Sequence, residues 1–437
     1  MTEVNHSVSK GAAGRIADLL AREKAVLVDY ASAISGSAGR LVFSLAYFVA
    51  LANTLTIADF GLFATASAAG VMLSRLLAFG FTAPLYRVAT VRPQLIGAFT
   101  AGFLMLSAIS LPAIAAAGWA VYALFFAATM PAAIFAAVLA AETLLWRPVE
   151  VVVIVLNGTG RFGLASVMVI LGTLLRALAA LAFMAWPARD LAAWSGFYLA
   201  ANAISLAVAA GFLYPRQRLR LRPALYWRRL GDSFAVAGAE VLFYLQMEFD
   251  KLVVLSLGGP HLAGVYAIIM RLVDLTAIPI RTFTMMLVQK MMRTPATLAR
   301  AGTRAAIEGG VFAVSTLALG ALALVLSVFP RLLGDNVSEA APLVALALLV
   351  PGFRNLVEYQ AELLFARGQT FVRAVNLALL AALKGGLLWL VLDRTAEIST
   401  MVLSLNPVFL ILYLASTVLT YGAMRRGRPA SRVSAPR

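Results

Sequence analysis

The sequence predicts an all-α polytopic membrane protein with twelve transmembrane helices in two six-helix bundles. Composition excludes a soluble domain, because 62% of the 437 residues are hydrophobic and only 13% are charged, against about 25% charged residues in soluble proteins. The apolar stretches are continuous and reach about 20 residues, the length of a spanning helix, whereas the strands of a membrane β-barrel alternate apolar and polar residues. Lysine and arginine gather in alternate loops, as in multi-span membrane proteins.

The spans divide the chain into two halves. The apolar spans are at residues 33–54, 61–84, 95–117, 132–156, 163–186 and 191–213, and at 233–257, 262–287, 305–329, 342–364, 372–392 and 399–422. They predict an N-terminal six-helix bundle at 33–213 and a C-terminal one at 232–422, joined by a basic cytoplasmic linker at 214–231. Residues 118–131 predict a separate interfacial helix, because this apolar stretch is too short to span and contains tryptophan and tyrosine.

The distribution of positive charge predicts the orientation. Cytoplasmic loops carry an excess of lysine and arginine, and with a cytoplasmic N-terminus the outer loops hold only Arg189, Arg331 and Arg394. Both termini are therefore predicted to be cytoplasmic. The N-terminal segment at 1–32 is either an amphipathic surface helix or a disordered tail, and a basic tail follows at 423–437. The net charge of +16 is thus a topology signal and does not predict nucleic-acid binding.

The second half of the chain repeats features of the first. Gly61, Phe63 and Arg87 align with Gly264, Tyr266 and Lys290 at one constant shift, and Glu150, Gly160 and Arg176 align with Glu358, Gly368 and Lys384 at another. An even number of spans in each half gives both halves the same orientation in the membrane. The sequence therefore predicts a parallel internal repeat, with the two bundles related by an axis along the membrane normal.

Charged side chains within the spans are the candidate functional residues, because each costs ~2.5–3.5 kcal/mol at the bilayer centre on insertion scales. They are Arg40, Arg75, Glu142, Arg147, Glu150 and Arg176 in the first half, and Glu240, Glu248, Asp250, Lys251, Arg271, Asp274, Arg281, Arg354, Glu358, Glu362 and Lys384 in the second. Helical periodicity places Arg271, Asp274 and Arg281 on one face, which favours a shared aqueous cavity. Snorkelling at span ends is one alternative. A structural ion pair between Arg271 and Asp274 is another, as is one between Arg354 and Glu358.

Three of these residues have no charged neighbour of opposite sign. No acidic residue lies within four positions of Arg40, Arg75 or Arg176 in their own spans. An unpaired arginine in a helix bundle requires an anion, either from a distant helix or from a ligand. Since the planar guanidinium group binds two phosphate oxygens at once, a phosphorylated ligand fits these residues.

Several kinds of chemistry are excluded by residues that the chain lacks. There is no cysteine, and the only histidines are His6 in the polar N-terminal segment and His261 in a loop. The chain also lacks a Walker-type phosphate loop, and its outer loops are short. We therefore expect a transporter without metal or cofactor, and neither an ATPase nor an enzyme with a catalytic outer domain.

At the seventh and eighth spans the chain resembles a known family. The residues concerned are Asp250-Lys251, the apolar run Leu252–Leu255, Gly258, Gly264-Val265-Tyr266 and Arg271-Leu272. They resemble the pattern of bacterial lipid-linked oligosaccharide flippases, the polysaccharide transporter family of the multidrug/oligosaccharidyl-lipid/polysaccharide (MOP) exporter superfamily. The segment Asp59-Phe60-Gly61-Leu62-Phe63 resembles the family's link between spans one and two. The six-plus-six layout extends the resemblance over nearly the whole chain.

The resemblance implies a V-shaped pair of bundles in the bacterial inner membrane that opens alternately to either side. The substrate would be a polyprenyl-diphosphate-linked oligosaccharide for lipopolysaccharide, exopolysaccharide or other polysaccharide synthesis, with a polymerase and glycosyltransferases as partners. The implied cationic cavity includes Arg40, Arg75, Arg271 and Arg281, and the intramembrane residues Arg176 and Lys384 complete the candidate substrate-binding set. The implied coupling to protons or sodium ions uses Glu240, Asp250, Asp274 and Glu358.

Two alternatives remain open. A cation-coupled multidrug exporter has the same fold, but its cavity is expected to be acidic, whereas the lone arginines favour an anionic substrate. A membrane glycosyltransferase or polymerase is the other alternative. The short outer loops count against it, because such enzymes usually present acidic catalytic residues on a large outer loop.

Overall fold

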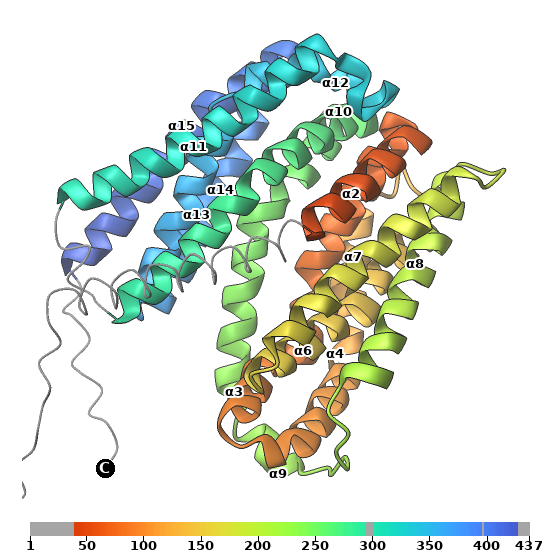
Figure 1. The fold of residues 1–437 in the computed structure, drawn as a ribbon, viewed down its shortest axis with the longest axis vertical. Coiled ribbons are helices and arrows are strands. Elements are labelled where there is room, and N and C mark those ends of the chain that lie inside the picture. Colours follow the sequence, from red (N-terminus) through yellow and green to blue (C-terminus); the bar gives the residue numbers. More distant parts are fainter. Residues whose placement is uncertain (1–38, 294–300, 396, 427–437) are drawn as a thin grey trace, which may run out of the picture.

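The computed structural model describes residues 39–293, 301–395 and 397–426, and every regular element within them is a helix. The predicted amphipathic segment and the end of the basic tail lie outside these residues. The predicted all-α class is confirmed, and Figure 1 shows the helices gathered in two bundles.

The N-terminal bundle begins with a short helix, and seven further α-helices follow it. Its elements are the helix Gly39–Thr54, α2 (Ile57–Ser74), α3 (Thr82–Val91), α4 (Ile96–Phe125), α5 (Ala132–Ala140), α6 (Arg147–Gly158), α7 (Phe162–Met184) and α8 (Leu191–Val208). A π-helical turn, Ala141–Trp146, joins α5 to α6. The start of α2 follows from local chemistry: Thr56 accepts a hydrogen bond from the Asp59 backbone amide and so satisfies a free donor of the first turn.

The linker contains one short helix, and the C-terminal bundle follows it. The elements are α9 (Pro223–Trp227), α10 (Leu230–Arg293), α11 (Ala301–Val328), α12 (Asp335–Val344), α13 (Val350–Ala366), α14 (Thr370–Arg394) and α15 (Ile398–Arg426). Helix α10 contains a turn at Gly259, whose φ of 76° is a left-handed conformation that favours glycine. The turn divides α10 into a first arm, residues 230–258, and a second arm, residues 260–293.

Helix covers most of the described residues of the twelve predicted spans, but two of the spans are broken. The span at 61–84 is interrupted at Ala78 and Phe79, whose φ values of 53° and 49° are not helical, and the span at 342–364 bends between α12 and α13. By length and composition alone, eight described helices qualify as spans, or nine if α12 and α13, bent by 68°, form one. The smaller number arises because α10 holds two predicted spans, the helix Gly39–Thr54 is short, and the π turn interrupts the α5–α6 span. The separate interfacial helix predicted at 118–131 is wrong, because α4 continues without a break to Phe125.

The two bundles meet where α2 packs against α10, and they diverge away from this contact (Figure 1). A Cβ atom on Gly61 would lie 2.5 Å from the carbonyl oxygen of Pro260, and one on Gly264 would lie 2.0 Å from that of Ile57. The shift that aligns Gly61 with Gly264 also aligns Ile57 with Pro260. The contact is therefore reciprocal, as expected at the axis of a parallel repeat.

A second pair of aligned glycines supports the repeat. Gly160 and Gly368 both have a positive φ, 74° and 72°, and each follows the last turn of a helix. In both places the next backbone amide donates five residues back, from Arg161 to Leu156 and from Gln369 to Leu364. This left-handed helix ending requires the freedom of glycine at both sites.

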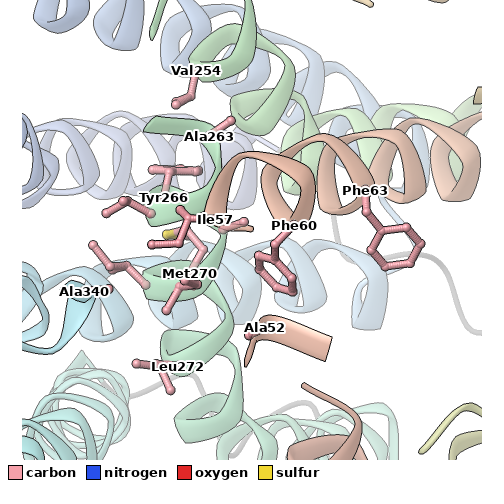
Figure 2. Packing of buried hydrophobic residues seen from close by; sticks show 14 of the residues in the cluster. Ala52, Ile57, Phe60, Phe63, Val254, Ala263, Tyr266, Met270, Leu272 and Ala340 are labelled. Atoms are coloured by element: carbon pink, nitrogen blue, oxygen red, sulfur yellow. The ribbon is translucent and has the colours of Figure 1, made fainter. Parts of the chain in front are cut away.

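Apolar side chains from both bundles fill the space around this contact. Figure 2 shows Phe60 of α2 near Tyr266 and Met270 of the second arm, with Ala340 of α12 on the far side. All four are buried in one continuous core cluster. The bundles are consequently sealed together at this end by close van der Waals packing, which is the main attraction between helices in lipid.

We expect Gly264→Ala to force α10 away from α2, because the added Cβ would collide with a backbone oxygen. Overpacking of this kind costs about 1–3 kcal/mol, so the unfolding temperature of the purified protein in detergent should fall. Gly196→Ala on α8 is the matched control, since a Cβ there meets nothing within 4 Å. Equal unfolding temperatures for the two variants would contradict the close crossing.

Candidate functional site

A cavity of about 320 Å³ lies between the two bundles. Its walls come from the helix Gly39–Thr54, α2, α7 and α8 of the N-terminal bundle and from both arms of α10. Its charged lining residues are Arg40, Arg176, Lys251, Arg271, Glu248 and Asp274. Four cations thus face two carboxylates, and the cavity is positively charged.

Two of the cations have no carboxylate partner. The Arg40 side chain is exposed and makes no hydrogen bond or ion pair within the described part of the chain. Arg271, on the second arm of α10, donates a hydrogen bond to the Ser44 hydroxyl and forms no ion pair with any described residue. The ion pair with Asp274 that the sequence offered as an alternative for Arg271 is not formed. Ser44 also joins the two bundles here, because it belongs to the first helix.

Arg176 is held in place by neutral groups. Its guanidinium donates to the Asn202 side-chain oxygen at 3.0 and 2.7 Å and lies 3.8 Å from the centre of the Trp146 ring. The nearest carboxylate, Glu142, is 3.8 Å away, beyond hydrogen-bond distance. Of the two sources of an anion that the sequence left open for Arg176, a distant helix supplies one, as a loosely placed carboxylate.

Glu142 is a buried acid next to this wall, bonded to the lining residues Ser67 and Tyr198, with a side-chain exposure of only 2%. One carboxylate oxygen accepts hydrogen bonds from Ser67 at 2.6 Å and from Tyr198 at 2.5 Å. The other has no hydrogen-bond partner among the described residues. Buried polar atoms are rarely left without a hydrogen bond. This oxygen, which lies 3.8 Å from Arg176, is therefore a place where a proton fits. The sequence showed Glu142 as an intramembrane charge but gave it no role.

Arg75 is fully paired, and of the two sources of an anion that the sequence left open, a distant helix provides it. It binds both oxygens of Glu150 on α6, at 2.7 and 3.1 Å, and its guanidinium lies 4.2 Å from the ring centre of Tyr244. Arg147 binds the same Glu150 at 2.9 Å and Glu240 on the first arm of α10 at 2.7 Å. A distant helix provides the anion for Arg75, and the cluster ties the first arm to the N-terminal bundle.

A similar cluster lies in the C-terminal bundle. Arg281 binds both oxygens of Glu358 on α13, at 2.9 and 2.8 Å, and Asp274 at 3.1 Å. Arg354 also lies 3.1 Å from Asp274. The pair that the sequence suggested between Arg354 and Glu358 is not formed. These four charges compensate one another beside the cavity, and Asp274 belongs to its wall.

Lys384 and Asp250 form a separate, fully buried pair. The ammonium nitrogen is 3.4 Å from the carboxylate, and the two side chains are 3% and 1% exposed. Tyr266 donates to the same carboxylate at 2.7 Å, and Lys384 also donates to the Gln246 carbonyl oxygen. Neither residue lines the cavity. Lys384 therefore does not reach a substrate bound there in this structure, and Asp250, the predicted ion-coupling residue, does not contact the cavity either.

The predicted site residues therefore fall into three groups. Arg40, Arg176, Arg271 and Asp274 line the cavity; Arg75 and Glu240, and Arg281 and Glu358, belong to clusters beside it; Lys384 and Asp250 are buried apart. Glu248 and Lys251 also line the cavity, as an ion pair one helical turn apart. In the described residues, no group of three or more His, Cys, Asp or Glu side chains is placed to hold a metal ion.

Asp250→Asn should destabilise the C-terminal bundle by about 3–5 kcal/mol, because it leaves the Lys384 ammonium buried without its counter-charge. The double variant D250N/K384M removes both charges and should recover most of the loss. Denaturant unfolding of these variants, K384M and the unchanged protein forms a double-mutant cycle. A double variant as unstable as D250N alone would argue against the buried pair.

No family model and no curated protein matches the sequence. Among solved structures, MATE in complex with MaL6 superposes with a TM-score of 0.59 at 14% identity, covering 89% of this chain and 93% of that one. An outward-facing multidrug resistance MATE family transporter of the MOP superfamily gives 0.58 at 13% identity, covering 89% and 92%. A mutant of the Vibrio cholerae MATE transporter VcmN gives 0.56 at 16% identity, covering 90% and 94%. The chain therefore has the fold of the MOP-superfamily exporters.

Proposed function

We propose that this protein is a flippase that moves an anionic lipid-linked saccharide, of the polyprenyl-diphosphate type, across the bacterial inner membrane by alternating access. The observation that carries the proposal is the pair Arg40 and Arg271, which line the interbundle cavity without carboxylate partners in the described chain. A cation between the low-dielectric walls of a helix bundle attracts a counter-anion more strongly than a cation in bulk water does. A diphosphate supplies that charge and fits the planar guanidinium group.

The cavity suits a headgroup and not a whole lipid. Its volume of about 320 Å³ is at the lower end of the range of about 300–1,000 Å³ for small-molecule sites. The diphosphate would enter between the bundles, while the polyprenyl tail stays in the surrounding bilayer, where its transfer costs nothing. A long sugar chain needs more room, so the bundles must separate further during transport.

The direction of opening follows from the predicted orientation. The crossing of α2 and α10 at Gly61 and Gly264 lies next to predicted outer loops, so the sealed end would be the outer one. The chain would then be in an inward-facing state, ready to receive substrate from the cytoplasmic leaflet. Opening outward requires the core around the crossing to part and the Arg147–Glu240 contact region to rearrange.

A cation-coupled multidrug exporter is the second candidate. One similar structure is described as a multidrug resistance transporter, and the fold fits both functions. A cationic drug needs an available carboxylate, but Asp274 and Glu248 of the cavity are each held by neighbouring cations. The positive cavity therefore favours the flippase. Two of the similar structures are described as transporters, which favours transport over the glycosyltransferase alternative.

Reversing both free charges, in R40E/R271E, should abolish transport, because two glutamates repel a diphosphate at the same positions. The assay is translocation of a labelled polyprenyl-diphosphate sugar in proteoliposomes, with R161E/R189E as a control that reverses two exposed arginines outside the cavity. Undiminished flipping by R40E/R271E would refute the assignment. Export of cationic drugs by the unchanged protein, strengthened in R40E/R271E, would select the multidrug exporter instead.

We also propose that proton coupling passes through Glu142, because one of its buried oxygens has no hydrogen-bond partner among the described residues. Glu142→Gln keeps the size of the side chain but cannot release a proton. We expect substrate binding to persist while stimulation of transport by a pH gradient disappears. Glu362→Gln, which changes a carboxylate paired with Arg373 away from the cavity, is the control. A normal response to the gradient in E142Q would exclude this role.

A further inference from the structure

A second pocket lies at the opposite end of the N-terminal bundle from the α2–α10 crossing. Its volume is about 410 Å³, and it is formed by α3, the start of α4, α9 and the start of α10. Figure 1 shows α3 and α9 together at this end, where the first arm of α10 begins. The pocket shares no lining residue with the interbundle cavity, so it belongs to neither the substrate site nor its charge clusters.

Three arginines give this pocket a positive charge. The side chains of Arg87 and Arg92 are exposed and form no hydrogen bond or ion pair within the described segments. Arg229 lies 3.9 Å from Asp232, and both side chains are at least half exposed. An exposed pair at this distance contributes little. The pocket therefore has a net positive charge, and Arg87 and Arg92 are free to bind an anion.

The rest of the wall is apolar. It includes Val88, Val91, Leu95, Phe99, Leu225 and Val236. An inorganic anion gains nothing from such a wall, whereas a molecule with an anionic head and a hydrocarbon chain contacts both parts. The arginines lie at the ends of spans, where headgroups meet the hydrocarbon of the bilayer.

The neighbouring linker has the composition of a segment that lies in the membrane interface. Leu219, Leu221 and Trp227 are each more than half exposed, among a run of arginines. Tryptophan favours the headgroup region, and apolar side chains next to basic ones suit an anionic surface. This places the pocket at the depth of lipid headgroups, on the side that the basic loops predict to be cytoplasmic.

We infer that this pocket binds an anionic glycerophospholipid of the leaflet it faces. Arg87 and Arg92 bind the phosphate, Arg229 adds positive charge, and an acyl chain packs along Val91 and Phe99. Basic pockets between helices on the cytoplasmic side bind anionic lipid headgroups in this way. Because α9 and α10 form one wall and α3 and α4 another, the lipid would also join the linker to the N-terminal bundle.

Native mass spectrometry of the purified full-length protein tests this inference. Dioleoyl-phosphatidylglycerol is titrated against the unchanged protein and R87Q/R92Q, with dioleoyl-phosphatidylcholine as the neutral lipid. We expect R87Q/R92Q to bind the first phosphatidylglycerol roughly 30-fold more weakly, from about 1 kcal/mol for each arginine. The control R161Q/R220Q removes two exposed arginines outside the pocket and should bind normally. The single variant R92Q, with an expected loss of about fivefold, serves if the double variant does not fold.

Three results would overturn the inference. Equal loss in R87Q/R92Q and R161Q/R220Q would mean that diffuse charge, not the pocket, attracts the lipid. Equal affinity for phosphatidylcholine would remove the role of the anionic head. Displacement of the lipid by glycerophosphoglycerol, which has no acyl chains, at equal concentration would identify a site for free anions only. Weaker phosphatidylglycerol binding by Val91→Ser would support the apolar wall.

Discussion

The interior of this protein depends on the rule that a charge removed from water needs a counter-charge close by. Both bundles satisfy this requirement with the same kind of ion pair. Arg75 on the second span binds both oxygens of Glu150 on the fourth, and Arg281 on the eighth span binds both oxygens of Glu358 on the tenth. Glu150 and Glu358 are aligned by the internal repeat. Two-oxygen pairing fixes the geometry as well as the charge, so each bundle holds its helices in a defined register.

The positive charge of the cavity comes from the arginines that are not paired in this way. Arg40 and Arg271 line the cavity from the two different bundles and have no carboxylate of their own in the described chain. Arg176 is anchored by Asn202, with the Glu142 carboxylate at the edge of contact. The cavity can therefore accept negative charge without breaking a structural pair. The same pairs that stabilise the bundles thus define what remains available to a ligand.

Sequence alone predicted the helices and the repeat well, because continuous apolar spans and aligned glycines are local signals. Pairing partners were harder to predict. Arg75 and Glu150 are 75 residues apart, and no spacing rule within one helix connects them. Glu142 was visible only as one intramembrane charge among many, since its partners Ser67, Tyr198 and Arg176 come from other helices. The end of α4 was missed because nothing in its composition marks where the membrane boundary falls.

The reciprocal contact of Gly61 and Gly264 has a further meaning. When equivalent positions of two copies touch each other in this way, the geometry is that of a twofold homodimer interface. In a true homodimer the two copies have the same sequence, so every side chain on one side of the axis also appears on the other side. Here both copies belong to one chain, so the first can carry Arg40 and Arg176 while the second carries Arg271 and the Glu248–Lys251 pair. A single polypeptide can thereby surround an asymmetric molecule with a different set of groups from each half.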